Sequence, residues 1–181
     1  MQRFRAEQWL PHPVEFVFAF FANPANLPRL MPHWQQPRID EIELHPAPPK
    51  STGAFPRPIA AGKGSRVTIS FRPAPLSPVR LSWVALIENF HWDHRFCDRQ
   101  IRGPFRYWRQ CHSMHACQSE RTGEHGTMVV DTIEYELPFG RIGQVTNRVA
   151  VRRLIASIFR YRHHRTTELL RELSAGGAHH E

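Results

Sequence analysis

The sequence predicts an α+β domain in which one antiparallel sheet of about seven strands is followed by a long C-terminal helix. Two observations lead to this fold class. From the N-terminus to residue 137, most segments alternate apolar and polar side chains, which is the period of a half-buried strand. After Gly143 the apolar residues recur at helical spacing. Segments rich in proline and glycine separate the alternating runs, as turns do.

The N-terminal part predicts one strand and two short helices. Residues 4–10 alternate as a strand does, and Pro11-His12-Pro13 then starts a helix, because proline is tolerated in a first helical turn. This helix should end near Asn23-Pro24, and a second short helix should cover residues 26–31 between two prolines. The first helix carries an apolar stripe made of Val14, Val17, Phe18 and Phe21.

Six further strands are expected. Residues 38–45 alternate imperfectly, which indicates a strand with a bulge. Residues 46–64 are rich in proline, glycine, alanine and serine without any period, so they should form an exposed excursion and are the expected place for disorder. The other strands are expected over residues 67–71, 81–87, 96–100, 108–114 and 127–137.

The C-terminal helix is predicted to be amphipathic. Its apolar stripe should face the sheet and consists of Val145, Val149, Leu154, Ile155, Ile158, Phe159, Leu169, Leu170 and Leu173. Its other faces, expected in solvent, carry Arg148, Arg152, Arg153, Arg160, Arg162 and Arg165. Residues 174–181 have nothing to bury and should form a flexible tail, which leaves residues 1–173 as a single domain.

Composition narrows the classes of partner. The chain of 181 residues has 24 Lys and Arg against 16 Asp and Glu, a net charge of +8. The arginines are spread along the chain without a recognition motif, so nucleic acid is not an expected partner, although the arginine-rich last helix leaves peripheral contact with an anionic membrane open. No apolar h-region begins the chain and no apolar run reaches the length of a membrane span, which predicts a soluble cytoplasmic protein.

The cysteines and histidines predict neither a disulfide framework nor a metal site. Cys97, Cys111 and Cys117 are odd in number and lack C-x-x-C spacing, so we expect them to be reduced. His91 and His94 are three residues apart, so on a strand they project to opposite faces. The adjacent residues Cys111 and His112 also project to opposite faces, so neither pair can readily bind one metal ion. No metal and no cofactor are expected.

Two expected strands joined at Gly103-Pro104 carry polar groups on an otherwise apolar face. Because alternate side chains of a strand share a face, Asp98 should lie on the same side as Phe96, and His112 on the same side as Trp108. Such a face suits the wall of an apolar yet selective pocket, or a half-exposed hairpin that meets water. The predicted ligand-binding residues are Phe96, Asp98, Gln100, Trp108, Gln110, His112, Met114, Asp131 and Tyr135.

The order of elements and three motifs resemble the START-like SRPBCC superfamily, which includes polyketide cyclase/dehydrase and lipid-transport proteins, and in particular its bacterial ligand-binding members. The order strand, two helices, six strands and long helix is that of the helix-grip fold. Gln110 stands where the family usually has its first histidine, and Met114 where it has phenylalanine. The motifs comprise Pro13, Val17, Phe18, Phe20, Phe21, Pro24, Asn26 and Leu27; Phe96, Asp98, Gln100, Gly103, Pro104, Phe105, Trp108 and His112; and Asp131, Tyr135, Pro138 and Gly140.

The resemblance implies a curved sheet wrapped around the last helix, with a cavity between them for a lipid, isoprenoid or aromatic polyketide-like molecule. One alternative is an enzyme of the cyclase/dehydratase type with His112 as general acid/base oriented by Asp98 or Asp131. In another, these groups only satisfy one another and fix the register of the sheet. A third is an adaptor or membrane-surface module that docks through the arginine-rich helix.

Overall fold

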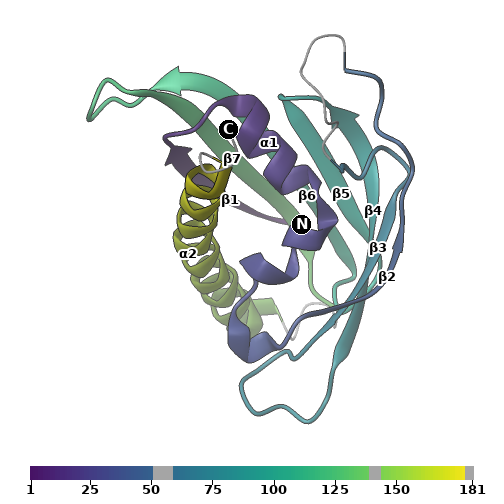
Figure 1. The fold of residues 1–181 in the computed structure, drawn as a ribbon. Helices are drawn as coiled ribbons and strands as arrows, with labels where there is room; N and C mark the ends of the chain where they lie inside the picture. Colours follow the sequence, from purple (N-terminus) through teal and green to yellow (C-terminus); the bar gives the residue numbers. More distant parts are fainter. Residues whose placement is uncertain (51–58, 139–143, 178–181) are drawn as a thin grey trace.

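The computed structural model describes residues 1–50, 59–138 and 144–177, and the side chains of the last helix from residue 150 onward. It has one antiparallel sheet, one α-helix and three short 3₁₀ turns near the N-terminus, and a long C-terminal helix (Figure 1). The strands are β1 (Gln2–Leu10), β2 (Arg38–Glu43), β3 (Arg66–Phe71), β4 (Leu81–His91), β5 (Arg95–Arg102), β6 (Tyr107–Gln118) and β7 (His125–Glu136). The helices are α1 (Val14–Ala22) and α2 (Gln144–Gly177).

The sheet confirms the predicted fold class. Its strand order is β1-β7-β6-β5-β4-β3-β2, so every strand except β1 lies beside its sequence neighbour and β1 closes onto β7. In Figure 1 the strands curve around one side of the molecule, while α2 lies along β1 and α1 crosses the inner face. The Gln8 side chain joins β1 to α2 by donating to the His163 carbonyl at 2.7 Å. This arrangement is the helix-grip fold.

The short helices predicted after the first strand are present, the first as an α-helix and the second as a series of short 3₁₀ helices. The Pro13 carbonyl accepts from the amides of Phe16 and Val17 and so begins α1. The second was expected over residues 26–31, and the structure has three separate 3₁₀ turns in place of one continuous helix: η1 (Pro24–Asn26), η2 (Pro28–Leu30) and η3 (His33–Gln35). A proline at every fourth position explains the difference, because each one lacks the amide that an α-helix needs and clashes with the preceding turn.

The segment after β2 is partly folded back onto the core. The bulge predicted in β2 lies between Ile39 and Glu41. The excursion predicted over residues 46–64 was expected to be exposed, but Ala61 is only 5% exposed and its amide donates to the Ala22 carbonyl at 3.0 Å. An isolated bridge joins Pro46 to Ala61. The expectation of disorder falls mainly on residues 51–58, which lie outside the described residues.

A disulfide on the outer face of the sheet contradicts the prediction that all three cysteines are reduced. Cys97 and Cys111 are joined by a disulfide. They face each other across β5 and β6, and both are buried. An odd number of cysteines without C-x-x-C spacing does not exclude this bond. The register of the two paired strands brings Cys97 and Cys111 together, although they are far apart in the sequence. Cys117 remains a free thiol.

Two clusters of buried side chains divide the space inside the sheet. At the end covered by α1, which we call the closed end, Phe18 packs against Phe90 and Phe96 at ring-centroid distances of 5.4 and 5.7 Å. At the other end, which we call the cavity end, Trp108 and Phe159 lie in a smaller cluster. The helix α2 continues through Gly177, so residues 174–177 of the predicted tail are helical, and residues 178–181 lie outside the described residues.

Candidate functional site

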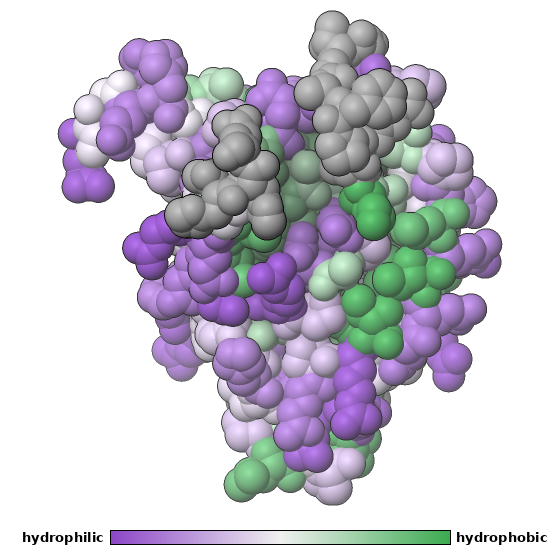
Figure 2. All heavy atoms as spheres, in the orientation of Figure 1, coloured by the Kyte–Doolittle hydropathy of each residue, from purple (hydrophilic) through white to green (hydrophobic). Residues whose placement is uncertain are grey.

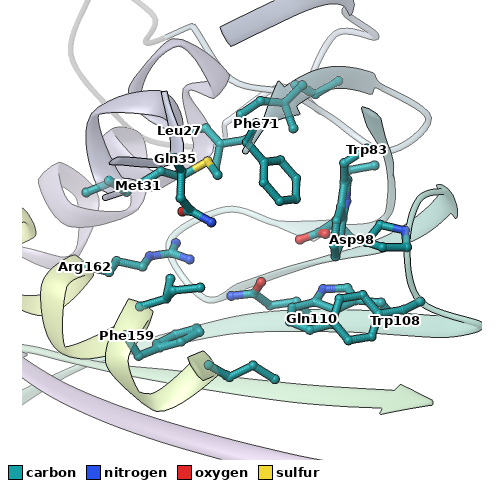
Figure 3. Close-up of a pocket in the computed structure, with 18 of the residues that line it drawn as sticks. Leu27, Met31, Gln35, Phe71, Trp83, Asp98, Trp108, Gln110, Phe159 and Arg162 are labelled. Atoms are coloured by element: carbon teal, nitrogen blue, oxygen red, sulfur yellow. The ribbon is translucent and has the colours of Figure 1, made fainter. Parts of the chain in front are cut away.

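A cavity of about 490 Å³ lies at the cavity end, between the sheet, the 3₁₀ turns and α2. Most of its lining is apolar, including Phe71 and Trp83 from the sheet, Leu27 and Met31 from between the 3₁₀ turns, and Phe159 from α2 (Figure 3). Its volume falls within the usual range for small-molecule sites, and a few polar side chains enter it. These polar groups come from β5, β6, η1, η3 and α2.

A buried pair of side chains forms the polar base of the site. His112 lines the cavity, and its Nδ1 contacts Oδ1 of Asp131, which lies directly across the ladder on β7. Gln110 adds a hydrogen bond from Nε2 to the same carboxylate at 3.3 Å. Burial alone would raise the pKa of Asp131, but the charges of His112 and Arg162 and these hydrogen bonds outweigh it and lower the pKa to about 2. Asp131 is therefore ionised at neutral pH.

Asp98 is placed differently from Asp131. Its carboxylate lines the cavity, with 16% of the side chain exposed, and lies 3.9 Å from Nε2 of His112. Burial raises the pKa of Asp98 to about 6, against the opposing attraction of His112 and Arg162. This carboxyl group can therefore gain or lose a proton near neutral pH while facing the cavity.

Arg162 enters the cavity from α2, although the sequence analysis placed it on a solvent face. Its guanidinium group lies over the rings of Phe21 and Phe159, at 5.2 and 5.6 Å from their centroids. The sequence did contain a signal, because Arg162 follows Ile158 by four residues and Ile155 by seven, which is the spacing of the apolar stripe. Arg152, Arg153 and Arg160 are exposed, as expected.

The predicted site residues separate into two groups. Five of the nine line the cavity: Phe96, Asp98, Trp108, Gln110 and His112. Gln100 does not line it, but exchanges hydrogen bonds with the backbone of Phe105 and so closes the turn between β5 and β6. Met114 is buried in the closed end, and Tyr135 is buried beside Trp108. Asp131 lies behind His112 and holds it.

Gln35 is a cavity residue that the sequence analysis missed. It belongs to η3, is only 4% exposed, and lines the cavity beside Arg162 (Figure 3). The segment that holds it has neither a helical nor a strand period. No pattern in the sequence therefore pointed to Gln35.

The sequence of residues 10–158 matches the family described as Polyketide cyclase / dehydrase and lipid transport, and the chain belongs to this family. No curated protein matches the chain in sequence. The fold of the family supports the binding of hydrophobic ligands in general. Among the described residues, no helix is long and apolar enough to cross a membrane.

Solved structures share the fold at low sequence identity. A protein from Thermus thermophilus is 18% identical with a TM-score of 0.54, and the alignment covers 93% of this chain and 99% of that one. A protein from Chromobacterium violaceum is 13% identical with a TM-score of 0.61, covering 93% and 96%. A protein of unknown function from Staphylococcus aureus is 9% identical with a TM-score of 0.64, covering 96% of each chain. These likenesses show the fold alone.

Proposed function

We propose that the protein binds a hydrophobic small molecule, of the lipid, isoprenoid or aromatic polyketide-like kind, in the cavity between the sheet and α2. The observation that carries this proposal is an apolar space of about 490 Å³ with polar groups confined to a few positions on its wall. Burial of an apolar ligand there is favourable by about 25 cal/mol for each Å² removed from water. The polar groups would orient one end of the ligand.

The walls of the cavity support a binding role more than a purely structural one. Trp83, Phe105 and Trp108 pack edge-on or tilted against one another, with centroid distances from 4.8 to 5.8 Å. These contacts hold large apolar faces in place without a ligand. A preformed apolar site binds with little loss of conformational entropy.

The experiment is a ligand screen with a matched pair of variants. Oleate, farnesol and 2-acetonaphthone are each added to the purified protein, and the melting temperature is measured. A ligand at one hundred times its Kd stabilises by about 2.7 kcal/mol, which is roughly 5 to 10 °C for a domain of this size. Native mass spectrometry of the protein as purified then shows whether a ligand is already carried.

Ala85→Trp is the blocking variant, because Ala85 lines the cavity from β4. Ser82→Trp is its control, because Ser82 is exposed on the same strand. The proposal expects Ala85→Trp to abolish the thermal shift and Ser82→Trp to keep it. A protein that carries nothing and is not stabilised by any of the three compounds would contradict the proposal.

The Asp131, His112 and Asp98 arrangement favours a second candidate function, proton transfer to or from a bound ligand. Asp131 holds one nitrogen of the imidazole, so that the other nitrogen points toward Asp98 and the cavity. An imidazole oriented by a carboxylate is an effective general base. This arrangement would serve an enzyme of the cyclase/dehydratase type.

Deuterium exchange tests the second candidate. In D₂O, a general base that removes a methyl proton of bound 2-acetonaphthone gives an enolate, which then takes deuterium from solvent at the same carbon. Nuclear magnetic resonance measures the exchange rate. The expected result is an exchange rate that falls at least about 100-fold in His112→Gln while the affinity is unchanged. Equal rates in both proteins would eliminate this candidate.

A further inference from the structure

The cavity presents hydrogen-bond donors and acceptors on facing walls. Arg162 from α2 and Gln35 from η3 lie close to each other on one wall, and the Asp98 carboxylate points toward them from the sheet (Figure 3). Gln110 lies between these two sides. The polar group of a bound ligand would therefore meet a guanidinium on one side and a carboxylate on the other.

On the wall that carries Arg162 and Gln35, one donor and one acceptor lack partners among the described residues. Within the described chain, no carboxylate reaches ion-pair distance of the Arg162 guanidinium, whose Nε is buried without a hydrogen-bond partner. Gln35 is 4% exposed, and its Oε1 also has no partner among the described residues. Burying a polar group without a hydrogen-bond partner is unfavourable, so a ligand that engages this wall recovers part of that free energy.

On the facing wall, the Asp98 carboxylate also lacks a hydrogen-bond donor among the described side chains. The His112 ring nitrogen, at 3.9 Å from Asp98, lies beyond hydrogen-bond distance, and no other described side chain donates to that carboxylate. Asp131, in contrast, is already engaged by His112 and Gln110. Asp98 is therefore the carboxylate that remains able to accept a hydrogen bond from a ligand.

We propose that the ligand carries a neutral hydroxyl group, an alcohol or a phenol, which accepts a hydrogen bond from Arg162 and donates one to Asp98. This inference rests on the proposed function. A carboxylate ligand would suit Arg162 but would be repelled by Asp98 and by ionised Asp131, and an ammonium would be repelled by Arg162. An ether accepts but cannot donate. Among these four groups, only a hydroxyl satisfies both walls without adding a charge.

The test compares three naphthalenes that differ in one substituent. Isothermal titration calorimetry at pH 7.5 gives the Kd of 2-naphthol, 2-methoxynaphthalene and 2-naphthoate for the full chain. Because a hydrogen bond to a charged group contributes about 1.5–3 kcal/mol, 2-naphthol should bind at least about tenfold more tightly than the ether. It should also bind more tightly than the anion.

Variants connect this preference to the two walls. Arg162→Met should remove most of the preference for the phenol over the ether, and the control Arg160→Met, an exposed arginine of the same helix, should keep it. Asp98→Leu provides a second variant if Arg162→Met does not fold, and it should reduce the preference as well. A preference that persists in both variants would overturn the proposal.

The possible outcomes separate this inference from the proposed function. If all three naphthalenes bind with equal affinity, the cavity binds hydrophobic molecules and the hydroxyl proposal is overturned. If 2-naphthoate binds most tightly, the ligand is an anion and the proposal is likewise overturned. If none of them binds and the screen with oleate, farnesol and 2-acetonaphthone is also negative, the proposed function itself fails.

Discussion

The closed end and the cavity end share one sheet and differ in what covers it. At the closed end, α1 places Phe18 against Phe90 and Phe96, and the space is filled by side chains. At the cavity end, 3₁₀ turns and α2 cover Trp83 and its neighbours, and about 490 Å³ remains between them. Short turns interrupted by proline cannot present the continuous apolar face that a helix does. The comparison teaches that the packed core and the open space proposed for the ligand lie at different ends of one inner face.

The largest expected effect breaks the closed end. Phe18→Ala should lower the free energy of unfolding by about 4 kcal/mol, because a fully buried aromatic ring is lost from a packed cluster. Trp83→Ala, at the cavity end, should cost about 2 kcal/mol, because this half-buried ring already borders empty space. Urea denaturation measures both values. Equal losses would contradict the division into two ends.

Asp131→Asn should have the next largest effect. Removing a buried charge that holds His112 should cost about 3 kcal/mol at pH 7. The folded protein lowers the pKa of Asp131 below its unfolded value of 3.8, so its contribution is present above pH 4 and is lost as the pH falls toward 2. Urea titrations between pH 2 and pH 7 should show the difference between the two proteins shrinking with acid. A difference independent of pH would refute this assignment.

Asp98→Asn should act in the opposite direction. Burial raises the pKa of Asp98 from 3.8 to about 6, so the folded state binds the proton more tightly and loses stability as the pH rises between these values. Above pH 6 the asparagine variant should therefore be more stable than the parent by about 3 kcal/mol, and below pH 4 the two should be alike. Thermal unfolding in a pH series checks this. Asp40→Asn, at an exposed carboxylate, is the control.

Gly103→Ala should give the smallest effect and confine it to the cavity end. A Cβ at Gly103 would come within 2.4 Å of the Gln100 side-chain oxygen, which must then release the backbone of Phe105. We expect a loss of about 1 kcal/mol and a few-fold weaker affinity for 2-naphthol, because Phe105 lines the cavity. Gly176→Ala is the control, since its Cβ meets nothing within 4 Å. An unchanged affinity for 2-naphthol would contradict the expectation that this turn shapes the cavity.

The sequence predicts the elements far better than it predicts the site. Alternation and helical period are local, so the strands and the long helix follow from them. Asp98 and Gln100 have the same parity on one strand, but the turn at Gly103 directs Gln100 to the backbone of Phe105. Gln35 lies in an irregular segment and gave no pattern. Local rules therefore place a residue on a face without saying which part of that face remains uncovered.

The two corrections about charge and cysteine have a common cause. Arg162 was placed in solvent because of its charge, although its helical position put it on the apolar stripe. The odd number and the spacing of the cysteines favour separate thiols, although Cys97 and Cys111 are equidistant from Pro104 and a hairpin centred there pairs them. In each case the position of the residue on its helix or hairpin predicts the contact that the structure shows. The residue's charge, or the number and spacing of the cysteines, does not.

The disulfide has a consequence for the geometry of the candidate site. It ties β5 to β6 on the outer face, one residue away from Asp98 on one strand and from His112 on the other. Sliding one strand along the other by two positions would keep every side chain on its proper face, and the covalent link forbids it. The spacing between the Asp98 carboxylate and the His112 imidazole is therefore fixed by a covalent link as well as by backbone hydrogen bonds.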